Sequence, residues 1–426
     1  MDFLILPTQL FDKKYLDKKY TYHLWEHPQY FKKYKYNKKK ILLHYGSMKY
    51  YYDYLNKNKF RVKYIKLNEK CNLKNYTLFN PIDKLKLPNN YTIIDSPNFL
   101  LTREQYQLYR DKTDKFFFNN FYMFSKKLLN ILPNVKSQDK YNRKKLPKNI
   151  KIPNLPSNSN DKKYIDYGIK KTNEKFKNNY GNTDNFEYPL THSTAKKWLR
   201  NFINNKLKKF GEYQDSIVKD ESFLFHSVLS TSINIGLLNP KEIIDEVLKK
   251  KVPMNSLEGL IRQYFWREYQ VYCYMYYNFD RKNYFGNSKK LNKKWYTGEL
   301  GIPPVDDAIK SGFETGYLHH ILRLMVVGNY MNLSGISPKE GYKWFMEFSC
   351  DSYEWVMNQN VLDMVFFVSG GATMWRPYAS SSNYILKMSN YKRGEWCDIW
   401  DDNYKNFIKR NKKKLYKFRY YFRGLK

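Results

Sequence analysis

The chain has 426 residues and a formal net charge of +36, because 76 Lys and Arg outnumber 40 Asp and Glu. Aromatic residues make up 19% of it, so it has enough apolar surface to bury a core and is not disordered overall. It has four cysteines and no CxxC pair, which excludes a disulfide-stapled secreted scaffold and argues against a zinc ribbon.

The N-terminus has too short an apolar run for a signal peptide, and no segment approaches the ~18 apolar residues of a membrane span. We therefore expect a soluble, intracellular protein that does not bind membranes. The positive charge is typical of proteins that bind polyanions such as nucleic acid. However, the abundance of Lys, Asn, Tyr, Phe and Ile is also what an AT-rich genome produces. Charge alone leaves both interpretations open.

The first third of the chain alternates short apolar strands with helices. We expect strands at residues 3–6, 41–44, 60–67 and 91–94. One helix is expected from Ser47, a suitable N-cap, to Leu55, and another begins near Thr102. This alternation predicts a parallel sheet covered on both faces, so residues 1–132 should form a Rossmann-like α/β domain. No GxGxxG or P-loop motif supports ordinary dinucleotide binding there.

A polar segment, residues 133–188, separates this domain from the rest. It contains three prolines between positions 147 and 156 and a polar run at 157–161, so we expect a long linker on the surface. After it, the spacing of apolar residues becomes helical and stays so. Residues 189–426 are therefore predicted to form an all-helical domain.

One aspartate in this helical part is expected to be buried. A helix within residues 338–357 would place four residues on one face: Trp344, Phe348, Asp351 and Trp355. A carboxylate inside an aromatic stripe is costly unless it meets a cation or several donors. Arg323, on the preceding predicted helix, offers that cation, so we predict an Arg323–Asp351 pair. The alternative is a purely structural buried salt bridge.

Other polar groups occur where core residues would be expected. Arg267 and Glu268 interrupt a hydrophobic helix. The hydroxyl groups near one turn are suited to phosphate; they belong to Ser227, Ser230 and Thr231. A glycine-punctuated aromatic loop is suited to stacking bases; it contains Trp375, Arg376, Tyr378 and Tyr384. Together these features indicate a large, flat, polar ligand among the helices and an aromatic rim for a second one.

Several motifs resemble the flavin-binding domain of the photolyase/cryptochrome superfamily. They are Gly211–Asp215, Leu224–Ser230, Gly236–Pro240, Trp266–Tyr269, His319–His320 with Arg323–Met325, and Tyr353–Val356. Within that superfamily the chain looks like the photolyase-related branch that includes the bacterial (6-4) photolyases. The N-terminal run Leu43–Leu55 also fits that branch.

The resemblance implies FAD bound in the helical domain, with the α/β domain in the place of an antenna domain. Ser227 and Ser230 would hold the cofactor's diphosphate, and Gln263 and Arg267 would line the flavin. Arg323 and Asp351 would lie beside the isoalloxazine, which agrees with the buried pair deduced above.

The resemblance also implies catalytic roles. His320 matches the histidine that faces the lesion, where a proton donor could act. Tyr378 and Tyr384 match tyrosines that contact a flipped-out lesion, and Arg376 could take a DNA phosphate. Trp344 matches the tryptophan next to the flavin in the photoreduction chain. Tyr296 stands where the family often has another tryptophan, which leaves the end of that chain open.

Many relatives carry a [4Fe–4S] cluster, but this chain lacks the ligands. The corresponding positions hold Pro304, Lys392 and Glu395, and Cys397 alone could be a remnant, so we predict no iron–sulfur cluster.

A lumazine-like antenna pigment would bind in the N-terminal domain. The residues that could contact it there are Glu26 and His44. His44 is better explained as a hydrogen-bonded histidine at the end of a strand.

The leading hypothesis is therefore a monomeric, light-driven lyase that repairs UV-damaged DNA, most readily the (6-4) product. One alternative is a cryptochrome-like blue-light photoreceptor that keeps the flavin and repairs nothing. Another is a basic nucleic-acid-binding protein whose flavin pocket has decayed.

Overall fold

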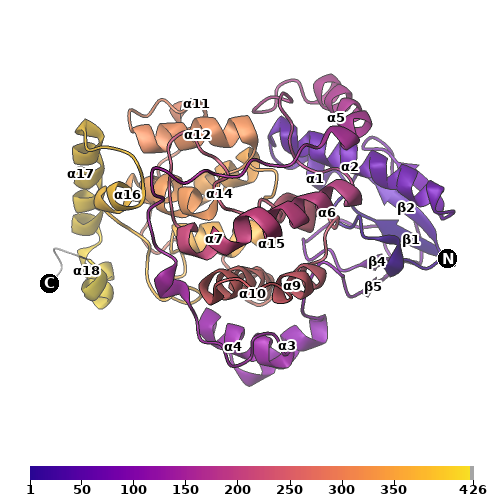
Figure 1. Cartoon of the computed structure of the whole chain (residues 1–426), viewed down its shortest axis with the longest axis horizontal. Helices are drawn as coiled ribbons and strands as arrows, with labels where there is room; N and C mark the ends of the chain where they lie inside the picture. The colour runs from indigo at the N-terminus through magenta and orange to yellow at the C-terminus, as the bar shows by residue number, and fades with distance from the viewer. Residues whose placement is uncertain (423–426) are drawn as a thin grey trace.

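The computed structural model describes residues 1–422. A five-stranded sheet lies at one end of the molecule, and helices make up most of the remainder (Figure 1). Within the described residues, no helix combines the length and the apolar character needed to cross a membrane.

The sheet is parallel throughout and has the strand order β3-β2-β1-β4-β5. Its strands are β1 (Asp2–Ile5), β2 (Thr21–Trp25), β3 (Arg61–Ile65), β4 (Tyr76–Phe79) and β5 (Tyr91–Ile94). In its register, Phe3 of the central strand lies between Tyr22 and Thr77. The predicted parallel α/β sheet is thus confirmed, but β2 and β4 were not among the expected strands.

The expected strand at residues 41–44 is wrong, because these residues lie inside helix α2 (Lys38–Lys57). The N-cap is Asn37, whose side chain accepts a hydrogen bond of 2.9 Å from the Lys39 amide. Ser47, expected as the cap, lies in mid-helix and donates to the Leu43 carbonyl at 2.6 Å. A four-residue apolar run cannot distinguish a buried strand from the buried face of a helix.

Helices α3 (Arg103–Lys112) and α4 (Phe118–Leu128) follow the sheet in sequence but lie beside helix α10 (Met254–Tyr276) in Figure 1. A capping box begins α3: Thr102 and Gln105 each accept a hydrogen bond from the other's backbone amide. On α4, the Tyr122 hydroxyl donates to Glu258 at 2.9 Å, which joins this helix to α10. Part of the first 132 residues therefore supports the helical half.

The segment expected as a linker contains helix α5 (Lys162–Lys175), which packs along α2 (Figure 1). Two glycines allow the close approach, since a Cβ on Gly46 or on Gly168 would come within 3 Å of a backbone carbonyl oxygen of the other helix. Before α5, the buried Asp161 carboxylate accepts hydrogen bonds from the Leu190 amide and the Thr191 hydroxyl, both at 2.8 Å. This segment is thus anchored at several points.

The remaining elements surround the site. They are η1 (Lys13–Tyr15), α1 (Gln29–Lys32), η2 (Asp139–Tyr141), η3 (Ser159–Asp161), α6 (His192–Asn201), η4 (Phe202–Lys206), α7 (Leu207–Tyr213), α8 (Ser230–Asn234), α9 (Pro240–Leu248), α11 (Lys294–Thr297), α12 (Pro303–Thr315), η5 (Leu322–Gly328), α13 (Asn329–Leu333), α14 (Pro338–Phe348), α15 (Glu354–Met357), η6 (Asn358–Val365), α16 (Asn383–Met388), α17 (Glu395–Arg410), α18 (Lys412–Leu415) and η7 (Tyr416–Tyr421). Of these, η4, η5 and η6 are π-helical.

The helix expected within residues 338–357 is broken. It ends at Phe348, and Asp351 lies in the connection between α14 and α15. Asp351 therefore reaches the site from a turn, not from a helical face.

Candidate functional site

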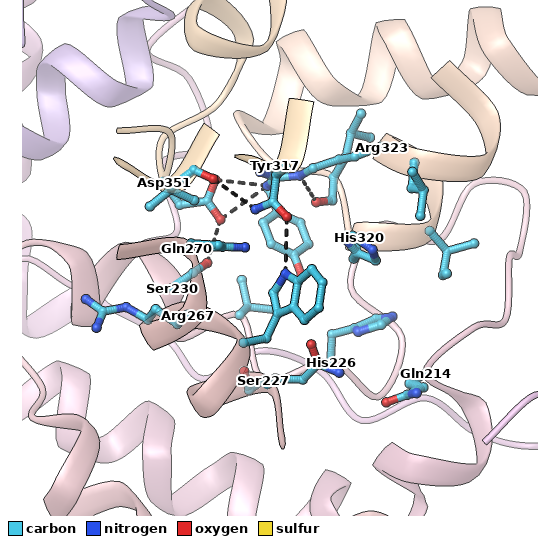
Figure 2. Close-up of a pocket in the computed structure, with 18 of the residues that line it drawn as sticks. Gln214, His226, Ser227, Ser230, Arg267, Gln270, Tyr317, His320, Arg323 and Asp351 are labelled. Carbon is cyan, nitrogen blue, oxygen red and sulfur yellow. Dashed lines mark hydrogen bonds and ion pairs between the residues drawn. The ribbon is translucent and has the colours of Figure 1, made fainter. Parts of the chain in front are cut away.

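A cavity of about 310 Å³ lies among α8, α10, η5 and the turn that carries Asp351. Seven residues singled out from the sequence line it: Ser227, Ser230, Gln263, Arg267, His320, Arg323 and Asp351. Figure 2 shows most of these side chains converging from separate segments of the chain. Residues chosen from the sequence, up to 124 positions apart, therefore line the same cavity.

The predicted Arg323–Asp351 ion pair is confirmed. An Nη of Arg323 donates to the two carboxylate oxygens at 2.9 and 3.2 Å, and the Ser230 hydroxyl donates to the carboxylate at 2.7 Å. The Ser349 hydroxyl donates to it as well. Burial alone would raise the pKa of Asp351, but Arg323 and the two serine hydroxyls together hold that pKa below its ordinary value. The carboxylate is thus kept charged inside the protein.

Arg323 is presented by the π-helical segment η5, and such segments occur frequently at functional sites. Its Nε donates to the Leu318 carbonyl at 2.6 Å, and its guanidinium lies 5.3 Å from the centre of the Phe348 ring. The side chain is therefore held by Leu318 and Phe348 as well as by the carboxylate of Asp351.

Arg267 supports the wall of the cavity. Its guanidinium donates to the carbonyl and side-chain oxygens of Asn98 at 2.6 and 3.0 Å and to Asn234 at 3.3 Å. Burial lowers the pKa of Arg267 to about 10, against the opposing effect of Glu268. Asn234 in turn donates to the Asp351 carbonyl at 3.0 Å. A hydrogen-bond network therefore links α10 to the turn that holds Asp351, and in Figure 2 Arg267 points away from the labelled centre of the cavity.

His320 presents its ring to the cavity. His320 is exposed to this cavity, yet the surrounding protein lowers the pKa of this histidine to about 4, first because it limits the contact of the ring with bulk water and second through the positive charge of Arg323. His320 is therefore neutral at pH 7 in the protein alone.

A pair of stacked histidines, of which His226 lines the cavity, was not assigned a role from the sequence. The rings of His226 and His319 stack with their centres 4.6 Å apart and their planes 11° from parallel. Among the described residues, Nε2 of His226 and both ring nitrogens of His319 have no hydrogen-bond partner. Burial lowers the pKa of His226 to about 3, and burial together with His226 lowers that of His319. Both rings are thus neutral over the physiological range.

Further residues of the cavity lie along one side of α10. Gln270 lines the cavity, as Figure 2 shows, and the Trp266 indole donates to Asn360 at 3.2 Å. The spacing of Gln263, Trp266 and Gln270 at three and four residues could have identified this face from the sequence.

A second, larger cavity of about 900 Å³ opens beside the first. The two share several lining residues, among them Gln263, Trp266 and His320. The structure brings the predicted rim residues Arg376, Tyr378 and Tyr384 together in the wall of this second cavity. His320 thus stands where a ligand in one cavity would meet a ligand in the other.

Arg376 is packed in an aromatic cage. Its guanidinium lies 5.2 Å from the ring centre of Trp375, 4.8 Å from that of Tyr378 and 4.9 Å from that of Tyr421. A cation over ring faces is held in place by their quadrupoles.

Trp344 lines neither cavity. It is fully buried, its indole donates to the Trp295 carbonyl at 2.7 Å, and its ring is 4.7 Å from that of Phe348. Phe313 lies between Trp344 and Tyr296, with ring-centre distances of 5.6 and 5.9 Å. Trp344 therefore occupies the layer behind Phe348, and aromatic rings continue from it to Tyr296.

Other groups of the protein contact both residues considered for an antenna pigment, Glu26 and His44. Glu26 accepts hydrogen bonds of 2.8 Å from the Tyr64 hydroxyl and the Leu67 amide, and burial raises its pKa. His44 is not at a strand end, as expected, but lies inside α2. Its Nε2 is 3.4 Å from the Tyr353 hydroxyl, and its Nδ1 has no partner within the described chain. The interpretation of His44 as a fully hydrogen-bonded strand-end residue is therefore wrong.

The four cysteines, including Cys397 in α17, are buried and unpaired by disulfides. Over residues 1–422, no group of three or more His, Cys, Asp or Glu side chains is arranged to hold a metal ion. The absence of an iron–sulfur cluster remains a prediction from the sequence.

Comparison with known families relates both halves of the chain to DNA photolyases. Residues 3–86 and 71–188 match the model of the deoxyribodipyrimidine photo-lyase-related proteins, and residues 260–400 match that of the FAD binding domain of DNA photolyase. A (6-4) photolyase of Agrobacterium fabrum is 35% identical over 257 residues, which are 56% of this chain and 51% of that protein. This alignment thus covers about half the length of that relative.

Solved structures share the fold. A bacterial class III photolyase from Agrobacterium tumefaciens superposes with a TM-score of 0.57 and 15% identity, covering 96% of this chain and 86% of the other. A cryptochrome from Synechocystis sp. PCC6803 does so with a TM-score of 0.59 and 13% identity, covering 97% and 89%. At such identities the likeness establishes the architecture alone.

Proposed function

Because this chain belongs to the photolyase/cryptochrome superfamily and contains its FAD-binding domain, we propose that it repairs UV-damaged DNA with light. The substrate would be a pyrimidine photoproduct, most readily the (6-4) type. That lesion is favoured by the 35% identity to a (6-4) photolyase. DNA is thus the proposed partner of the basic, aromatic rim.

One observation carries the proposal: the two cavities meet at His320. The smaller cavity contains a buried ion pair and serine hydroxyls, which suit the isoalloxazine and diphosphate of FAD. The larger one has an aromatic wall, which suits pyrimidine rings turned out of a duplex. Contact between a cofactor and a lesion is what a one-electron repair reaction requires.

The residues present fit the cofactor. Asp351 and Arg323 would flank the flavin ring, and Ser227 and Ser230 would hold the diphosphate, with Gln263 and Arg267 in the surrounding wall. When bound and reduced, FAD would supply the light-excited electron that starts the repair. Arg323 would keep positive charge beside the site where negative charge increases.

His320 would transfer the proton. It lines both cavities, so it can give a proton to a lesion that has received an electron and take it back when the bonds have rearranged. Lesion phosphates bring negative charge, which would raise the pKa of His320 from about 4. Tyr378 and Tyr384 would hold the lesion's rings, and no net oxidation or reduction results.

Trp344 is the proposed first donor for reduction of the flavin in light. Its ring packs directly on that of Phe348, with the ring centres 4.7 Å apart. The Phe348 ring in turn lies 5.3 Å from the Arg323 guanidinium. From there the aromatic residues Phe313 and Tyr296 offer a continuation toward the surface.

The runner-up is a cryptochrome-like photoreceptor, since the Synechocystis cryptochrome shares the fold. The presence of His320, Tyr378 and Tyr384 in one cavity wall favours repair.

One assay separates these functions. The flavin-loaded protein is incubated with reductant and an oligonucleotide that carries either a (6-4) product or a cyclobutane dimer, and is then illuminated. We expect restored pyrimidines from the (6-4) substrate. Restoration of neither lesion by a fully reduced, flavin-loaded protein would contradict the proposal and support signalling.

A further inference from the structure

The C-terminal segment forms a strongly basic surface. Between Asn403 and Phe422 the chain has eight basic residues and no acidic one. They are Lys405, Lys409, Arg410, Lys412, Lys413, Lys414, Lys417 and Arg419. In Figure 1 helices α17 and α18 lie at the end of the molecule opposite the sheet. These eight basic residues therefore lie together at that end of the molecule.

This segment is fixed to the body of the protein. The buried Phe418 packs on Phe367 with ring centres 5.3 Å apart, and the Lys417 ammonium donates to the Gly370 carbonyl at 2.9 Å. The Tyr284 hydroxyl donates to the Lys414 carbonyl, also at 2.9 Å. The basic surface is thus held in one position relative to the cavities.

Aromatic rings are exposed on the same segment. Tyr416 is 59% exposed and Tyr420 is 73% exposed. The Arg419 guanidinium lies between them, 4.9 Å from one ring centre and 4.7 Å from the other. The rings are therefore ordered by a cation while other parts of their surfaces remain open to solvent.

These rings continue from the mouth of the larger cavity. Tyr421, the last residue of η7, lines that cavity and meets Trp375 edge-on at 5.0 Å. Trp375 is itself 54% exposed. A path of aromatic and basic side chains thus leads from the cavity wall onto the outer surface.

We propose that Tyr416, Arg419 and Tyr420, with Lys409, Lys412 and Lys413 beside them, form a platform that binds single-stranded DNA. Ring faces stack on any base, and ammonium groups bind the phosphates between bases. In a duplex the base faces are covered by their neighbours, so only unpaired nucleotides can use such rings. This inference builds on the proposed function, because it names the form of DNA that continues from the same cavity.

The test uses a fluorescent, lesion-free 16-nucleotide oligothymidine and the full-length protein in the dark, with binding followed by anisotropy. Tyr420→Ala and Tyr416→Ala should each weaken binding by about fivefold or more, since stacking on one ring contributes ~1–3 kcal/mol. Both variants should bind a duplex of the same length with nearly the affinity of the wild-type protein. Tyr91→Ala, which removes a tyrosine 45% exposed on β5, should change neither affinity.

A charge series gives an independent readout. Replacing Lys409, Lys412 and Lys413 by Gln should reduce the slope of log K against log salt by about 2, because each phosphate contact contributes ~0.7 for single strands. The matched control replaces Lys57, Lys63 and Lys66, exposed at the other end of the molecule, and should leave the slope unchanged.

Single-strand affinity that is unaltered in both tyrosine variants would overturn the platform. So would equal losses on duplex and single strand, or binding to anionic lipid vesicles in place of the oligonucleotide. Because the probe has no lesion and stays in the dark, these results are independent of whether the protein repairs DNA. Absence of repair in the illuminated assay would likewise leave the platform standing.

Discussion

The Arg323 guanidinium lies 2.9 Å from the Asp351 carboxylate, although the two residues are 28 positions apart in the chain. Their side chains are 13% and 10% exposed, so the pair is nearly dry. A charged pair of this kind is costly to bury and costlier to break, because removal of one partner leaves the other unpaired.

Asp351→Asn is therefore expected to lower the free energy of unfolding by about 3 kcal/mol and to reduce FAD retention. Urea denaturation of the flavin-free protein and the flavin absorbance after gel filtration measure the two effects. The control is Asp245→Asn, which breaks an exposed pair with Lys241 and should cost less than about 1 kcal/mol. Equal losses in the free energy of unfolding for the two substitutions would show that the buried pair stabilises the protein no more than an exposed pair does.

His320→Ala should abolish repair of the (6-4) product while FAD stays bound, because the variant removes the proposed proton donor and leaves the ion pair intact. Product formation under blue light and the flavin spectrum of the purified variant check this. Full repair activity in the variant would place the proton donor elsewhere.

The stacked histidines predict acid sensitivity. His226 has a pKa of about 3 and His319 a pKa well below its ordinary value, while in the unfolded chain both take up protons near pH 6.5. As pH falls below about 6.5 the unfolded state binds protons that the folded state does not, so these residues destabilise the fold progressively toward pH 4. Above pH 6.5 they have no such effect.

Buried carboxyls act in the opposite direction, since the pKa of Asp215 is raised to about 6 and that of Asp83 to about 7. The effect of His319 is therefore measured as the difference in the free energy of unfolding between a variant and the wild type. His319→Phe should gain stability relative to the wild type as pH falls from 7.5 to 4.5, by up to about 1.4 kcal/mol per pH unit below pH 6.5. A difference that does not change with pH would contradict a neutral, buried His319.

Arg376→Ala should weaken DNA binding and lower the salt slope by about one, because a single phosphate contact is lost. Arg61→Ala on the distant strand β3 serves as the control and should leave the slope as it is. Measurements of binding at several salt concentrations decide between them. An unchanged slope for the Arg376 variant would remove this residue from the DNA-binding face.

Trp344→Phe should slow the photoreduction of bound FAD without changing its affinity, since phenylalanine fills most of the space but is much harder to oxidise. The rate at which the oxidised flavin spectrum disappears under blue light with a reductant gives the readout. In the control variant Trp198→Phe, which also replaces a fully buried tryptophan, the flavin should be reduced at the normal rate. Normal photoreduction of the Trp344 variant would exclude it as the first donor.

The sequence was most informative where burial and charge conflict. Asp351 among aromatic residues requires a cation, and that requirement identified Arg323 even though the helix assumed for Asp351 ends three residues earlier. The pair followed from the charges of the two side chains, so it could be predicted without knowing that Asp351 lies in a turn.

Other features depend on tertiary contacts that no local pattern records. The run 41–44 is apolar because α2 is buried on nearly every side, and this pattern is compatible with a strand. His226 and His319 stack only because the fold brings together residues 93 positions apart. Strands β2 and β4 have four or five residues each, too few for an alternating pattern to be distinguished.

The π-helical form of η5 has a consequence for the tolerance of this site to change. Its wider turn fits more residues into the same length of axis than an α-helix does. Deletion of a single residue between Arg323 and Gly328 would therefore let the segment close into regular α-helical winding, and the helical segments on either side would keep their directions. The same deletion in a regular α-helix such as α10 would turn everything on one side of it by about 100°. The site should thus tolerate the loss of one residue here better than in α10, with Arg323 still facing Asp351.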